Sequence, residues 1–154
     1  MKFVYILIAF AVFSPVANAV DYRWTLGFAQ GTTEAIIRNA TGASLDIYCP
    51  SGQTDHTPGI FLETDKVRPR LHEQIDVQII VDGNNYPFYF EEIQFKAAGR
   101  INMVSLHALI NALVKSNRKT FTVEFPKFGN SETFSVLDAR KALGSAAAFL
   151  SGCE

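Results

Sequence analysis

Alternation between apolar and polar residues recurs along this chain and constrains its fold more than any other feature. In Ile75–Val81 every second residue, counted from Ile75, is a branched aliphatic residue. Successive side chains of a strand point to opposite faces, so this segment predicts a strand with one buried face. Asp82–Asn85 then has the composition of a tight turn, and Tyr86–Phe90 alternates again. We therefore expect a β-hairpin over Ile75–Phe90.

Similar alternation predicts further short strands on both sides of this hairpin. They are Tyr22–Phe28, Glu34–Arg38, Ser44–Cys49, Ile60–Glu63, Thr120–Pro126 and Thr133–Val136. In the first, Tyr22, Trp24, Leu26 and Phe28 would share one face. The turn-rich segment Pro50–Gly59 predicts an exposed loop, and Lys66–Glu73 is expected to be irregular because of Pro69.

Two helices are predicted in the C-terminal half. Met103–Lys115 has apolar residues at spacings of three and four, which form one stripe. Val136–Ser151 has an alanine-rich stripe, with Asp138 in a capping box at its start and Gly144 tolerated inside at a cost of about 1 kcal/mol. The fold class is therefore mainly β (α+β): an antiparallel β-sandwich or curled sheet with two helices in the C-terminal half.

The first nineteen residues have the three parts of a secretory signal peptide. Lys2 is followed by the uncharged apolar segment Phe3–Phe13, and Ala17–Ala19 ends the segment with small residues at the cleavage positions. A membrane-spanning helix needs roughly 20 apolar residues, about twice this length. We expect cleavage after Ala19, which leaves residues 20–154 as a single β-rich domain. The expected location is periplasmic or secreted, and the mature chain should be soluble, with no membrane insertion.

The only two cysteines, Cys49 and Cys153, both lie in the exported part. In an oxidising compartment such a pair usually forms a disulfide, and Cys49 shares a strand face with aliphatic residues. A bridge would close a loop of about 100 residues, worth roughly 4–5 kcal/mol in the chain-entropy model. A reactive thiol, a metal-ligand pair or an intermolecular bridge are the alternatives.

The charge balance argues against two classes of partner. Lys and Arg number 14 and Asp and Glu number 15, so the net charge is −1, and removing Lys2 makes it −2. A near-neutral chain argues against nucleic acid as the main partner. It also argues against electrostatic attraction to anionic membranes.

No pattern of catalytic, metal or cofactor chemistry stands out in the sequence. The histidines His56, His72 and His107 lack the short spacings of zinc sites. Glu91 and Glu92 would point to opposite faces of a strand. Asp82–Asn85 resembles part of a calcium loop in residue type but lacks its later ligands. We therefore predict a protein that is not an enzyme and binds no cofactor or metal.

The chain resembles small periplasmic proteins of the invasion-associated locus B type. The matching features include Trp24 near the mature start, the strand ending at Cys49, and the hairpin residues Val81–Gly83. Others are the Ser105–Leu106 helix, the strand Phe121–Phe125, and Phe134–Val136 before an alanine-rich helix. The resemblance implies a non-enzymatic β-rich fold with a role in host interaction or the envelope.

We thus expect an exported, non-catalytic binding module that contacts another protein. The candidate contacts are Tyr89 on the hairpin and four residues of the turn-rich loop, namely Ser51, Gln53, Asp55 and His56. One alternative is a protein inhibitor or immunity protein that inserts this loop into an envelope enzyme. Another is a small envelope hydrolase using His56, His72, Asp55 and Glu73. A structural envelope subunit is a third class. Asn39–Thr41 is a glycosylation sequon, relevant only in a eukaryotic cell.

Overall fold

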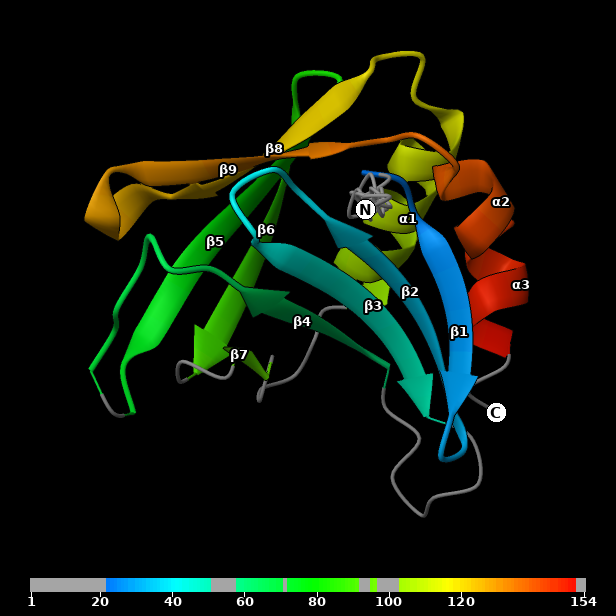
Figure 1. Ribbon diagram of the computed structural model, residues 1–154, viewed down its shortest axis with the longest axis horizontal. Helices are drawn as coiled ribbons and strands as arrows, with labels where there is room; N and C mark the ends of the chain where they lie inside the picture. The colour runs from blue at the N-terminus through cyan, green and yellow to red at the C-terminus, as the bar shows by residue number, and fades with distance from the viewer. Residues whose placement is uncertain (1–21, 51–57, 71, 92–94, 97–102, 152–154) are drawn as a thin grey trace, which may run out of the picture.

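The computed structural model describes residues 22–50, 58–70, 72–91, 95–96 and 103–151 (Figure 1). The predicted signal peptide lies outside this range. So do Cys153, Glu92 and the loop residues Ser51, Gln53, Asp55 and His56.

The strands form two antiparallel sheets, which confirms the predicted fold class. The first has five strands in the order β1 (Thr25–Ala29), β2 (Thr32–Arg38), β3 (Ser44–Pro50), β4 (Gly59–Glu63) and β7 (Phe95–Lys96). The second has four, in the order β6 (Asn84–Glu91), β5 (Gln74–Val81), β8 (Thr120–Phe125) and β9 (Asn130–Ser135). The helices α1 (Met103–Lys115), α2 (Ala139–Leu143) and α3 (Ala146–Ser151) belong to the C-terminal half, with a short 3-10 helix η1 at Pro126–Phe128.

The predicted hairpin is confirmed as β5 and β6. Val81 pairs with Asn84, so the turn has only two central residues, Asp82 and Gly83. Their φ angles are 52° and 82°, in the left-handed region that such a turn requires at both positions. Glycine and aspartate tolerate this region better than most residues, which explains why the turn forms at this point.

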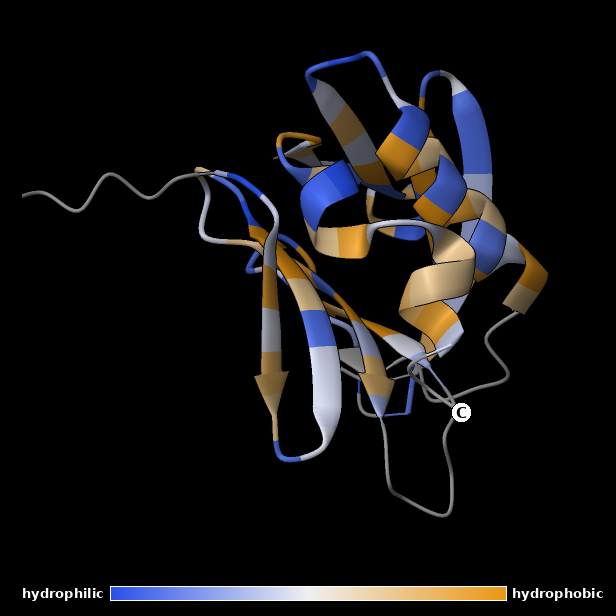
Figure 2. Ribbon diagram, turned by 90° about the vertical axis from the view of Figure 1, so that its right-hand side faces the viewer, coloured by the Kyte–Doolittle hydropathy of each residue, from blue (hydrophilic) through white to orange (hydrophobic). Residues whose placement is uncertain are grey.

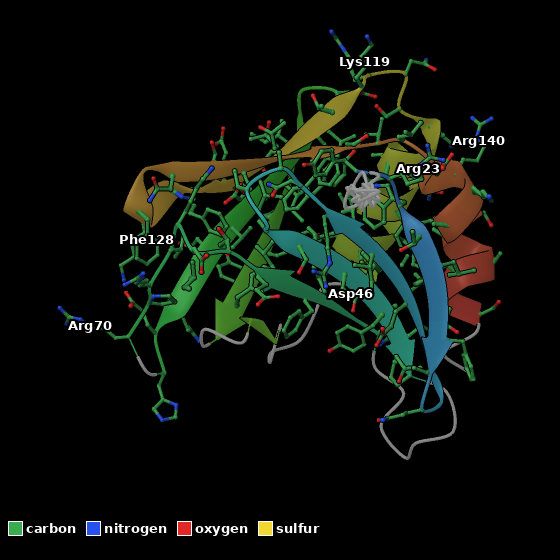
Figure 3. The ribbon with its side chains drawn as sticks, in the orientation of Figure 1. Arg23, Asp46, Arg70, Lys119, Phe128 and Arg140 are labelled. Carbon is green, nitrogen blue, oxygen red and sulfur yellow. The ribbon has the colours of Figure 1, made fainter. Side chains whose placement is uncertain are left out.

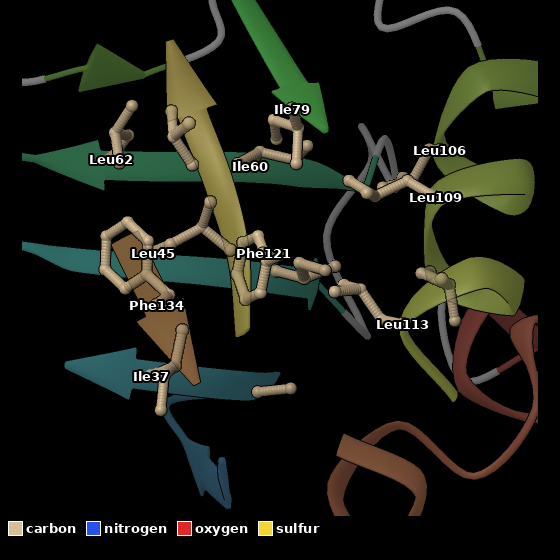
Figure 4. Close-up of a cluster of buried hydrophobic side chains, with 14 of the residues drawn as sticks. Ile37, Leu45, Ile60, Leu62, Ile79, Leu106, Leu109, Leu113, Phe121 and Phe134 are labelled. Carbon is tan, nitrogen blue, oxygen red and sulfur yellow. The ribbon is translucent and has the colours of Figure 1, made fainter. Parts of the chain in front are cut away.

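Helix α1 has the predicted bounds and supplies one side of the core. Its stripe Leu106, Leu109, Ile110 and Leu113 is buried. Figure 4 shows three of these leucines directed toward side chains of both sheets, among them Ile60 and Phe121. The helix thus closes the space between the inner faces of the sheets.

The prediction of one helix over Val136–Ser151 is wrong, because the chain breaks at Gly144. Gly144 has φ 60° and ends α2, donating its N–H to the Arg140 carbonyl at 3.0 Å. The predicted capping box is also wrong. Asp138 has φ 64°, makes no capping bond, and instead pairs with Arg23 at 3.2 Å. On the two sides of the break, α2 and α3 each bury apolar residues and each contact α1.

Trp24 joins the start of β1 to the second sheet. Its ring, 2 % exposed, stacks on Phe121 with centroids 6.2 Å apart, and Phe121 stacks on Phe134 at 5.5 Å. The indole N–H donates to the Ser135 carbonyl at 3.1 Å, and the Trp24 backbone N–H donates to the Leu137 carbonyl at 2.9 Å. The predicted shared face is therefore buried at Trp24, whereas Tyr22, Leu26 and Phe28 are exposed. The inner face of an edge strand is buried only as far as the opposite layer reaches.

A buried carboxylate forms the second connection between the sheets. Glu132 on β9 is 1 % exposed and accepts hydrogen bonds from Thr64 Oγ1 at 2.7 Å, Asn39 Nδ2 at 2.8 Å and Thr41 Oγ1 at 2.9 Å. Lys66 Nζ lies 3.1 Å from it. All four donors belong to segments that follow strands of the first sheet. A buried carboxylate with this many donors is well compensated for its lost hydration.

Asn39, the asparagine of the sequon, is part of this cluster. Its side-chain nitrogen donates to Glu132 and, at 3.2 Å, to the Thr133 carbonyl, and the residue is 8 % exposed. A glycan on that nitrogen would break the cluster and is incompatible with this packing.

Burial alone would raise the pKa of Glu132, but the hydrogen bonds around it outweigh burial and hold the pKa below its ordinary 4.5. Stability from this group is therefore present above about pH 4.5 and is lost as the pH falls through the lowered folded-state pKa. We predict that Glu132→Gln lowers the free energy of unfolding at pH 7 by about 3 kcal/mol, because it removes the ion-pair partner of Lys66 and brings an amide donor toward other donors. Urea unfolding of both proteins measures this difference.

The matched control is Ser131→Ala, an exposed position next to Glu132 on the same strand. This control should leave the unfolding free energy within about 0.5 kcal/mol of the native value. The difference between Glu132→Gln and the native protein should shrink at pH 3. Equal stability at pH 7, or a difference that persists unchanged at pH 3, would contradict the role given to this carboxylate.

Candidate functional site

The residues predicted as protein contacts are only partly within the described range. Tyr89 on β6 is 69 % exposed, so its predicted exposure is confirmed. The loop residues between β3 and β4 that were predicted to contact a partner remain predictions. Cys49 is fully buried on β3, as a half-cystine would be, and its pairing with Cys153 also remains a prediction.

Two of the four residues predicted for a hydrolase are described, and they do not form a catalytic pair. His72 is exposed and has φ 61°. The Glu73 carboxylate pairs with Lys127 Nζ and accepts the Arg70 backbone N–H at 2.6 Å. The hydrogen bond from Lys127, followed by that from Arg70, lowers the pKa of Glu73. A carboxylate held in its charged form suits an ion pair better than proton donation.

We also searched the part of the chain that the structure describes for groups of metal ligands and for pockets. No group of three His, Cys, Asp or Glu side chains there could hold a metal ion. A small open pocket of about 230 Å³ lies beside η1, lined by Glu124, Phe125, Pro126, Gly129, Asn130 and Ser131. This lining has one hydroxyl, that of Ser131, and one carboxylate, that of Glu124, and it contains neither histidine nor cysteine.

The edge strand β1 exposes large apolar side chains. All five of its residues are exposed, including Leu26 at 57 % and Phe28 at 70 %. Among the residues that the structure describes, it pairs only with β2, and it borders the first sheet in Figure 1. Figure 2 shows hydrophobic residues toward the end of the strand. Proteins usually protect such an edge with lysine, proline or an inward charge, and Thr25–Ala29 has none of these.

The outer face of the first sheet carries a partly buried carboxyl group. Asp46 on β3 lies opposite Ile36 on β2 and Phe61 on β4, and Figure 3 shows it over the middle of the sheet. Its Oδ1 atom is buried without a hydrogen-bond partner among the described residues. Burial, and then the nearby charge of Glu34, raise the pKa of Asp46 to about 7. This carboxyl group can therefore exchange a proton near neutral pH.

Tyr48 makes the surroundings of Asp46 less polar. Its ring lies across Gly59 on β4, where any Cβ atom would overlap the ring. Burial, and then the charge of Asp46, raise the pKa of Tyr48. The sheet therefore needs glycine at position 59 for this ring to cover the outer face.

Sequence reasoning missed both β1 and Asp46 as functional candidates. The alternation in Ser44–Cys49 places Asp46 on the polar face, but nothing in that segment shows that Glu34 lies nearby. For β1, the absence of a protective charge was a readable signal, but only once its edge position is known.

Asp46 opposes folding when it is charged, because its folded-state pKa lies above its ordinary 3.8. The folded state then binds more protons than the unfolded state, so stability falls as the pH rises from about 3.8 to about 7. We predict that Asp46→Asn raises the thermal midpoint at pH 8 and has little effect at pH 4. Thermal unfolding followed by circular dichroism across this range measures the change.

Asp76→Asn, at an exposed aspartate on β5, is the control and should give no such pH-dependent gain. If Asp46→Asn raises the thermal midpoint equally at pH 4 and pH 8, or does not raise it at pH 8, the titration assigned to Asp46 is wrong.

None of the helices in the described ranges is long and apolar enough to cross a membrane. No curated protein and no solved structure matches the sequence. A family model described as YfjT matches residues 22–143, which is most of the chain. This match does not test the resemblance to invasion-associated locus B proteins, which remains a prediction. With more than half of its length matched, the chain belongs to the YfjT family.

Proposed function

We propose that this protein is an exported, non-catalytic binding module that acts in the periplasm or outside the cell, and that it contacts a partner protein through β1. The observation that carries the proposal is the edge of β1, which has no second partner strand among the described residues and which exposes Leu26 and Phe28 at 57 % and 70 %. Export is supported by the signal-peptide pattern of residues 1–19.

An extended peptide segment of the partner protein fits this edge. A strand that adds to a sheet edge gains main-chain hydrogen bonds, and side chains at alternate positions give specificity. Leu26 and Phe28 lie two residues apart and so point to the same face of the sheet. Burying either side chain fully is worth about 1.5–3 kcal/mol. The partner segment should therefore carry apolar residues at alternate positions.

The edge is already ordered before any partner binds. Five consecutive residue pairs join β1 to β2, and Trp24 fixes the start of the strand against Leu137 and Ser135. Binding then avoids most of the entropy cost of ordering a loop. Tyr89 is equally exposed, but its strand β6, the edge of the other sheet, contains Pro87, and proline is one of the residues that protect an edge.

Affinity capture from the native envelope, with residues 20–154 as bait, tests the proposal. Phe28→Lys places a charge where the partner would bury an aromatic ring, so we expect it to reduce recovery of the captured protein at least tenfold. Quantitative mass spectrometry of the bound fraction measures recovery.

Tyr89→Lys is the matched control, since Tyr89 and Phe28 are 69 % and 70 % exposed and the substitution is the same. It should recover the same protein as the native bait. Thermal unfolding should confirm that both variants are folded. The proposal fails if the native bait captures nothing reproducibly, or if the two variants lose recovery equally.

A further inference from the structure

We propose that a second surface, at the C-terminal end of α1, binds the phosphate groups of an anionic membrane. This "basic end" consists of Arg23, Lys115, Arg118, Lys119, Arg140 and Lys141, all of them exposed. The contact is peripheral, and it is separate from the protein contact proposed for β1.

Three segments distant in sequence form the basic end. Arg140 on α2 reaches the last turn of α1, where its Nε atom donates to the Val114 carbonyl at 3.4 Å. The Lys119 carbonyl accepts the Val136 N–H at 3.0 Å, just before α2. Arg23 joins the group through its ion pair with Asp138 at 3.2 Å. Figure 3 shows Arg23 and Arg140 near each other and Lys119 projecting from the adjoining top of the fold.

Half of these six positive charges are not used inside the fold. Lys115 and Arg140 complement the negative end of the α1 dipole, and Arg23 pairs with Asp138. The side chains of Arg118, Lys119 and Lys141 have no hydrogen bond or ion pair within the described ranges. The second carboxylate of this region, Asp82, accepts the Ser116 hydroxyl at 2.8 Å. The overall charge of −1 therefore conceals a strongly positive surface.

Exposed apolar side chains at the same end favour a membrane over an acidic protein. Leu137 is 51 % exposed between Val136 and Asp138, and its carbonyl is the acceptor for Trp24. Tyr22, beside Arg23, is 44 % exposed. Basic residues around an exposed leucine and an aromatic ring are typical of surfaces that lie at the headgroup boundary, where the cations meet phosphates and the apolar groups enter the interface.

Sedimentation of residues 20–154 with vesicles tests this surface. We expect binding to phosphatidylcholine vesicles that contain phosphatidylglycerol, weak binding to pure phosphatidylcholine, and loss of binding at high salt. Arg118→Gln with Lys119→Gln should weaken binding roughly twenty-five-fold, which follows from about a fivefold loss for each basic residue. Leu137→Ser should weaken it further without changing its salt dependence.

The matched control is Arg68→Gln with Arg70→Gln. These two arginines are also exposed, their side chains make no hydrogen bond among the described residues, and the change in net charge is the same. Figure 3 shows Arg70 at the far side of the fold from Arg23 and Arg140. This control should bind within twofold of the native protein. Thermal unfolding should show that all variants keep the native midpoint.

Two results would overturn the proposal. Equal losses in the two double variants would mean that binding follows net charge and not this surface. Failure of the native protein to prefer phosphatidylglycerol vesicles would exclude a membrane, and retention on immobilised polyglutamate in that case would assign the surface to an acidic protein. Phe28→Lys, which tests the protein contact at β1, should bind vesicles at least as well as the native protein. The proposal for β1 and the proposal for the basic end can therefore fail independently.

Discussion

The insertion of Trp24 between the two sheets is the interaction on which the rest of the structure depends. Its ring belongs to the segment that leads into β1, yet it stacks on Phe121 and donates to the Ser135 carbonyl in the second sheet. An aromatic ring of this size buries a large apolar area, and its N–H needs a partner once it is buried. Both needs are met only when β1 starts at this place and in this register. The edge strand is therefore held at its base while its apolar side chains stay in solvent.

Glu132 holds the same two sheets together by a different kind of interaction. Its side chain is buried on the same face of β9 as that of Phe134, two residues further along. Its hydrogen bonds come from segments that follow strands of the other sheet. Aromatic packing resists changes of pH, whereas the Glu132 cluster weakens in acid because its donors need a charged acceptor. Asp46 has the opposite effect on stability. Burial on the outer face disfavours its charged form, so this residue destabilises the fold as the pH rises. The fold thus loses stability on either side of an intermediate pH range.

Local periodicity was enough to predict the β5–β6 hairpin and α1, because the apolar pattern of each, and the tight turn of the hairpin, can be read within a short stretch of sequence. It failed at Gly144, because periodicity marks the apolar positions on both sides of this residue but does not show that its backbone takes a positive φ and ends the helix. It also could not show that Leu26 and Phe28 are exposed, since alternation tells which residues share a face but not whether another layer covers it. Glu132, Asp46 and the basic end have partners or neighbours in distant segments, so only the fold brings them together.

The central claim is that β1 is an ordered strand with a free edge, and amide hydrogen exchange of the protein alone tests it most directly. Measured residue by residue by NMR, alternate amides of β1, those directed away from β2, should exchange quickly. The amides of β3, which is paired on both sides, should exchange slowly throughout. Slow exchange at every amide of β1, at the level of β3, would show that the edge is already covered and would contradict the account.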